Sequence, residues 1–185
     1  MPLSKPSPRK HLHTRDIRCT GFQRDDGLWD IEGSMTDKKS YSFDNVDRGG
    51  VAAGEAIHHM LIRLTVDDDL VVQAAQASTE AGPYSICGDI TANFANLNGV
   101  RIGPGWRKEI TRLMGGVAGC THLRDLLMGP LAVTALQTVV PVRAKRDGGK
   151  GDTKPGLINT CHAYADDGPI VARQWPAHSR KSEEA

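Results

Sequence analysis

The sequence lacks three features that would each assign it to a well-defined class. No apolar run approaches the roughly 20 residues needed to span a bilayer, and residues 1–6 lack the apolar stretch of a secretory signal. The charges almost cancel, with 23 Lys and Arg against 22 Asp and Glu and a net charge of +1, so no excess of base indicates a nucleic-acid partner. We therefore predict a cytoplasmic protein that binds neither a membrane nor nucleic acid.

Cysteine is scarce and irregularly spaced. The chain has four cysteines, Cys19, Cys87, Cys120 and Cys161, and none of them forms a Cys-x-x-Cys motif. Because disulfides are rare in the cytoplasm, these residues are better explained as buried thiols, metal ligands or a nucleophile than as a disulfide framework.

Length and composition are those of a globular protein. The chain has 185 residues, of which 39% are hydrophobic and 24% are charged, and this suits one domain with its own core. We predict a single domain over 13–176, with a flexible arm over 1–12 and a flexible tail over 177–185. A basic, glycine-rich linker is expected near 143–155.

Alternating apolar and polar residues predict hairpins of β-strands. Trp29, Ile31, Gly33 and Met35 alternate with polar residues, and the turn signal at 25–27 precedes them, so 13–36 is expected to form a hairpin. A second hairpin is predicted over 57–74, around the acidic turn at 67–69, and a third over 157–174, around 166–168. Residues 37–55 are polar and contain glycine, which indicates a loop.

The region after the second hairpin has helical periodicity. Helices are expected over 87–97, from about 103 to 114, and after Cys120, the last one interrupted at Gly129-Pro130 because Pro130 cannot donate its amide. The predicted fold is therefore α+β, an antiparallel sheet of hairpin strands with helices packed on one face.

A cluster of Cys and His residues is the candidate functional centre. Cys87 and Cys120 each open a predicted helix, where the positive end of the helix dipole favours a thiolate. His122 follows Cys120 by two residues, and His58 lies on the apolar face of its strand. Two thiolates and one or two imidazoles suit zinc or iron, so His58, Cys87, Cys120 and His122 form the predicted metal site.

The same residues fit two other interpretations. In a metal-free enzyme, Cys120 would be the nucleophile and His122 or His58 the base, in a pocket lined by Trp106. In a non-catalytic accessory protein, the cysteines would only be buried, as free cysteines often are. Cys19 and Cys161 are interpreted as packing residues under all three hypotheses.

Several strings resemble a bacterial family of uncharacterised proteins that is defined only as a domain of unknown function. They are DGLWDIEGSMTD, IHHMLIRLTVDDDL, IGPGW and GGVAGCTHLRDLL, and the resemblance covers roughly 13–175. It implies a fold and a location, but no activity.

The order of elements over 56–137 has a more distant likeness to the iron–sulfur cluster scaffold superfamily of the NifU/IscU/SufE type. That likeness implies a scaffold-like core, with Cys87 and Cys120 at the second and third ligand positions and His58 near the first. The first cysteine of the scaffold is absent here, and His122 follows Cys120 instead of preceding it. The likeness therefore favours a single zinc or iron ion over a cluster. We expect metal binding, and a fourth position open to water would allow hydrolase or lyase chemistry on a small molecule.

Overall fold

The chain divides into two compact units, Met1–Arg146 and Asp147–Ala185. The computed structural model describes residues 3–148 and 156–180 of them. The boundary falls within the predicted basic linker, but α3 of the first unit, Pro130–Arg146, includes the start of that linker. Residues 143–146 are thus helical rather than irregular, and 149–155 lie outside the described residues. The single domain predicted over 13–176 stays a prediction.

The first unit is built on a four-stranded antiparallel sheet whose strands are neighbours in chain order. The strands are β1 (His13–Gln23), β2 (Trp29–Lys39), β3 (Ala56–Val66) and β4 (Val72–Ala81). The first two hairpins are therefore confirmed, with β2 extending to Lys39, beyond the predicted end at residue 36. This extension places Asp37, which was expected in a loop, inside the sheet.

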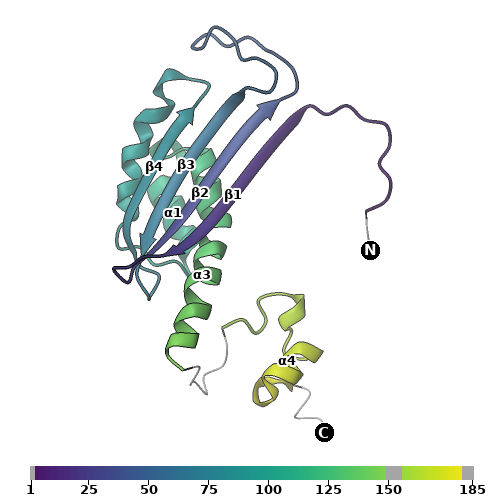
Figure 1. The fold of residues 1–185 in the computed structure, drawn as a ribbon, viewed down its shortest axis with the longest axis vertical. Coiled ribbons are helices and arrows are strands. Elements are labelled where there is room, and N and C mark those ends of the chain that lie inside the picture. Colours follow the sequence, from purple (N-terminus) through teal and green to yellow (C-terminus); the bar gives the residue numbers. More distant parts are fainter. Residues whose placement is uncertain (1–2, 149–155, 181–185) are drawn as a thin grey trace. The chain divides into compact units, whose positions relative to one another are not determined.

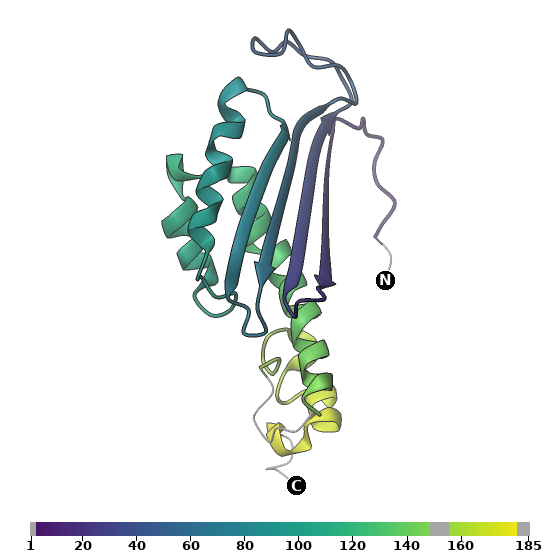
Figure 2. The ribbon, with the colours of Figure 1, turned by 60° about the vertical axis from the view of Figure 1, so that its left-hand side comes forward.

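The helices of this unit lie on one face of the sheet and along its β4 edge, and they leave the other face open (Figures 1 and 2). They are the 3₁₀ helix η1 (Ser85–Leu97), α1 (Trp106–Met114), the short 3₁₀ helix η2 (Gly116–Ala118), α2 (Thr121–Met128) and α3 (Pro130–Arg146). The predicted α+β class, with an antiparallel sheet and helices on one face, is confirmed. The break at Gly129-Pro130 is also confirmed, because α2 ends at Met128.

One hydrophobic core joins the sheet to its helices. Alternate residues of β2 and β3 are buried, and they pack against apolar residues of η1, α1, α2 and α3, among them Phe94, Trp106, Leu127 and Leu131. Trp106 is buried and donates its indole N–H to the carbonyl of Leu127 at 2.7 Å. Trp106 is therefore a core residue, whereas the nucleophile hypothesis placed it on the wall of a pocket.

The segment Thr121–Arg146, which contains α2 and α3, is long and apolar enough to cross a membrane by length and composition alone. Its buried residues, such as Leu123, Leu127 and Leu131, belong to the core described above. Core helices of this kind pass the same test, so this is weak support for a span. The prediction that the protein binds no membrane stays a prediction.

The second unit contains short helices instead of the predicted third hairpin. These are η3 (His162–Tyr164), α4 (Pro169–Gln174) and η4 (Pro176–His178), and no strand occurs among residues 156–180. The turn signal at 166–168 precedes Pro169, which begins α4 because a proline is well tolerated at the first position of a helix. The pattern at 166–168 was a helix start and not a hairpin turn.

Candidate functional site

The site forms around Asp37, a buried carboxylate on the helix-covered face of the sheet. Along β2, positions 29, 31, 33 and 35 are buried by strand alternation, and Asp37 is the next residue in this series, with only 1% of its surface exposed. A buried carboxylate must be paired with hydrogen-bond donors or cations. The neighbours of Asp37 provide both.

Arg15 and His13 on β1 bind this carboxylate from one side. Arg15 lies directly opposite Asp37 in the β1–β2 register. It donates from Nε to Oδ1 and from Nη2 to Oδ2, both at 2.8 Å. His13 Nε2 lies 3.1 Å from Oδ1. The planar guanidinium therefore fixes the orientation of the carboxylate.

Two imidazoles approach Asp37 from the other side. His58 is opposite Asp37 in the β2–β3 register, and its Nδ1 lies 3.0 Å from Oδ2. His122, the second residue of α2, places Nε2 3.8 Å from the same oxygen. The two rings are in contact and tilted, with centroids 3.8 Å apart and an angle of 35° between their planes. The structure thus brings together His58 and His122, as predicted, but it adds Asp37.

The two predicted cysteine ligands occupy different positions. Cys120 precedes the first residue of α2, as predicted, and its Sγ lies 3.8 Å from His122 Nδ1. Cys87 is the third residue of η1, not its first, and packs beside Gly82 at the end of β4. Asp37, His58 and His122 form a group of potential ligands among the described residues, and this group includes neither cysteine. Ligation by Cys87 or Cys120 stays a prediction.

Cys19 and Cys161, which were interpreted as packing residues, differ from each other. Cys19 is partly buried against the core, and burial raises the pKa of its thiol. Cys161 is exposed, so the packing interpretation is wrong for that residue.

The electrostatics of the site favour an ionised carboxylate and neutral imidazoles. Burial raises the pKa of Asp37, but the hydrogen bonds and charges of Arg15 and His58 outweigh burial and lower it to about 2. Burial lowers the pKa of His58, and the charge of a protonated His122 lowers it further. Burial also lowers the pKa of His122, and the positive charge of Arg15 adds to this effect. At neutral pH Asp37 is therefore ionised, and each imidazole has one unprotonated nitrogen.

The three side chains are close enough to hold one ion. One ligand atom from each of Asp37, His58 and His122 lies within 4.8 Å of the other two. Donors around a tetrahedral zinc are roughly 3.3 Å apart when each bond is about 2.0 Å, so only small side-chain movements are needed. Asp37 is a candidate ligand that was not predicted from the sequence. The alternation of buried residues along β2 continues to Asp37 in the structure, but a polar residue at this position does not reveal it in the sequence.

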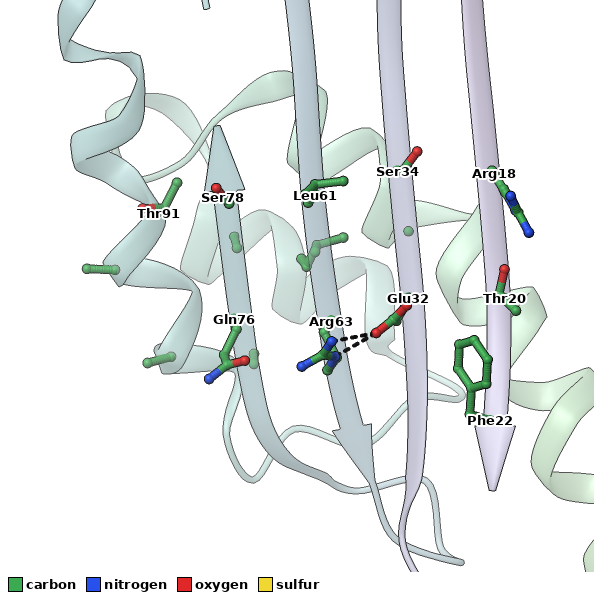
Figure 3. Close-up of a pocket in the computed structure, with 16 residues that line it drawn as sticks. Arg18, Thr20, Phe22, Glu32, Ser34, Leu61, Arg63, Gln76, Ser78 and Thr91 are labelled. Carbon is green, nitrogen blue, oxygen red and sulfur yellow. Dashed lines mark hydrogen bonds and ion pairs between the residues drawn. The ribbon is translucent and has the colours of Figure 1, made fainter. Parts of the chain in front are cut away.

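A separate hollow of about 980 Å³ lies on the open face of the sheet (Figure 3). Polar side chains from all four strands line it, and across its floor Arg63 donates to Glu32 at 2.8 Å. Thr91 of η1 borders it on the β4 side. None of the residues around Asp37 contributes to this hollow.

Comparisons with known proteins identify a family but no activity. Neither the curated proteins nor the solved structures include a match, and the comparisons give no support to the iron–sulfur scaffold likeness. One family model matches residues 13–137, which include all four strands, Asp37, His58, Cys120 and His122. The chain belongs to the family described as protein of unknown function (DUF2889).

Proposed function

We propose that the protein binds a single divalent metal ion, zinc or iron, through Asp37, His58 and His122. The observation that carries the proposal is the convergence of two imidazoles and one carboxylate, with donor atoms within 4.8 Å of one another. Two histidines and one carboxylate are a common ligand set for zinc hydrolases and for non-haem iron.

The arrangement leaves room for chemistry at the ion. Three protein ligands leave at least one position open in a tetrahedral or octahedral ion, and a water bound there is acidified. The side chains of His58 and His122 are 15% and 22% exposed, so each imidazole has some surface that faces solvent. Hydrolysis or elimination on a small-molecule substrate is the activity that this centre suits best.

Arg15 and Cys120 would act on the ligands rather than on the ion. Arg15 orients Asp37 through two hydrogen bonds, but the positive charge of Arg15 would repel a metal cation. The carboxylate of Asp125, 3.8 Å from the Arg15 guanidinium, partly offsets that positive charge. Cys120 Sγ faces Nδ1 of His122, so it can accept a hydrogen bond from the Nδ1–H and leave Nε2 free to coordinate. Such partners of ligating histidines set the tautomer and the orientation of the ring.

Metal uptake by the full-length protein tests the proposal. After removal of metal with a chelator and dialysis, titration calorimetry with Zn²⁺ is expected to show one site per chain, and Fe²⁺ added anaerobically should compete for it. A variant with Asp37→Asn, His58→Ala and His122→Ala together is the control. Equal binding by the wild type and this triple variant would overturn the proposal.

A second candidate function rests on the pair Cys120 and His122. The Sγ–Nδ1 distance of 3.8 Å and the nearby carboxylate of Asp37 give the order thiol, imidazole, carboxylate that activated nucleophiles use. Cys120 would then be a nucleophile for acyl or similar transfer, with His122 as its base.

Labelling with iodoacetamide distinguishes this second function from a buried, inert thiol. Cys120 is expected to react faster than Cys19, whose thiol pKa is raised by burial, and His122→Ala should slow Cys120 alone. Mass spectrometry of the labelled peptides measures each rate. Equal rates for Cys19 and Cys120, unchanged by His122→Ala, would exclude the nucleophile.

A further inference from the structure

The outer edge of β1 is an unpaired strand edge within the described part of the chain. β1 has eleven residues and is the terminal strand of the sheet, whereas the opposite terminal strand, β4, contacts η1 along its side. Figures 1 and 2 show β1 at the side of the sheet away from η1. Long exposed edges present backbone donors and acceptors that another strand can pair with.

The backbone of β1 determines which residues are available for such pairing. The carbonyl of Leu12 accepts from Ser40, and the N–H of Arg24 donates to Leu28, so even-numbered residues bond to β2. Because the direction of these groups alternates along a strand, odd-numbered residues direct their N–H and C=O groups outward. The residues whose backbone groups point outward are His13, Arg15, Ile17, Cys19, Gly21 and Gln23.

The side chains at the centre of β1 are complementary in charge to those of a second, antiparallel β1 strand. Asp16, Ile17 and Arg18 are all exposed, and Ile17 is 44% exposed. If two copies pair antiparallel with Ile17 opposite Ile17, Asp16 of each copy faces Arg18 of the other. Figure 3 shows Arg18 directed to the outer side of β1, away from β2. Opposite charges at facing positions stabilise a strand pair.

The same register also pairs the exposed apolar residues. Phe22 is 46% exposed and Leu12 is 52% exposed, and centring on Ile17 places each Phe22 opposite the Leu12 of the other copy. Shifting the centre to Asp16 or to Arg18 keeps the hydrogen bonds but brings two like charges face to face. It also places Phe22 opposite Lys10 or Thr14. Charge and apolar contact therefore favour the register centred on Ile17 over these two.

We propose that the protein forms a homodimer in which the β1 strands of two copies pair antiparallel, with Ile17 on the two-fold axis. The two four-stranded sheets then form one continuous sheet, with the helices of both copies on the same side. The open-face hollows of the two copies, each lined by Arg18, Thr20 and Phe22 of β1, become neighbours across the axis. This inference does not depend on metal binding.

Charge reversal tests both the dimer and its register. Sedimentation velocity on full-length protein, over roughly 1 to 200 μM, should show a concentration-dependent dimer. Asp16→Arg alone places two arginines face to face and should raise the dimer Kd by tenfold or more, on the order expected for two reversed pairs. Asp16→Arg combined with Arg18→Asp restores opposite charges and should recover the dimer.

Each outcome decides for or against the proposal. All variants should keep the wild-type circular dichroism spectrum, because both side chains are exposed. Ile17→Lys, which places two charges on the axis, is a second variant that should give a monomer. A monomeric wild type, or a dimer that both Asp16→Arg and Ile17→Lys leave intact, would overturn the proposal.

Discussion

His58→Ala is expected to lower the affinity of the full-length protein for zinc by on the order of 100-fold or more. Loss of a group that only orients a ligand typically costs 10- to 100-fold, and loss of a ligand should cost at least as much. The chain offers a matched control in His59→Ala. His59 follows His58 on β3, but neighbouring residues of a strand face opposite sides, so His59 points away from Asp37.

The comparison of these two variants separates a site from non-specific histidine binding. Competition titrations with a chromophoric zinc chelator, carried out on both variants and the wild type, give the three affinities. His59→Ala should bind zinc within about threefold of the wild type, since it removes no ligand. Similar losses in both variants would mean that zinc binds elsewhere or through scattered surface histidines.

Asp37→Asn is expected to remove much of the acid sensitivity of the metal-free protein. The pKa of Asp37 is lowered from 3.8 to about 2. A difference of this size corresponds to about 2 kcal/mol of stability that the folded state gains when the carboxylate is ionised. Asparagine keeps the shape of the side chain but cannot carry the charge that Arg15 pairs with.

The sign of the effect follows from the direction of the shift. Because the folded-state pKa is lower than the unfolded one, the unfolded chain takes up the proton first as the pH falls. The contribution is therefore complete above about pH 5 and is lost progressively as the pH approaches 2. His58 and His122, whose pKa values are also lowered, add a loss that begins as the pH falls below their ordinary value of 6.5.

Urea denaturation in the presence of EDTA at pH 7, 5 and 3 measures this dependence. Between pH 5 and 3 the wild type should lose more stability than Asp37→Asn, and the variant should already be less stable at pH 7. Asp44→Asn, at an exposed position between β2 and β3, is the control and should follow the wild type. Parallel pH profiles for wild type and Asp37→Asn would contradict the assigned role of the buried carboxylate.

Much of the fold follows from local patterns in the sequence. The alternation from Trp29 to Met35 and the apolar face of β3 determine which side of each strand is buried, and acidic or glycine-containing turns mark two hairpins. The third predicted hairpin failed because Asp-Asp-Gly also precedes helices, and Pro169 determined the outcome. The distinction depends on the residue after the turn, and a proline there favours a helix start.

The candidate site was predictable only in part, because strand register brings its members together. His58 and His122 were predicted as ligands from their residue type and position. Asp37 was missed, since the polar residues after Met35 indicated a loop, and only the pairing with Arg15 and His58 explains a buried carboxylate there. The preference for cysteines came from their rarity and from helix starts, and neither feature determines which side chains meet.

X-ray absorption at the zinc edge, on protein loaded with one equivalent of zinc, tests the central claim most directly. Ligation by Asp37, His58 and His122 predicts a first coordination shell of nitrogen and oxygen at about 2.0 Å with the outer-shell scattering of two imidazoles. Sulfur at about 2.3 Å would instead show that a cysteine such as Cys120 binds the ion, and it would contradict the ligand set proposed for this protein.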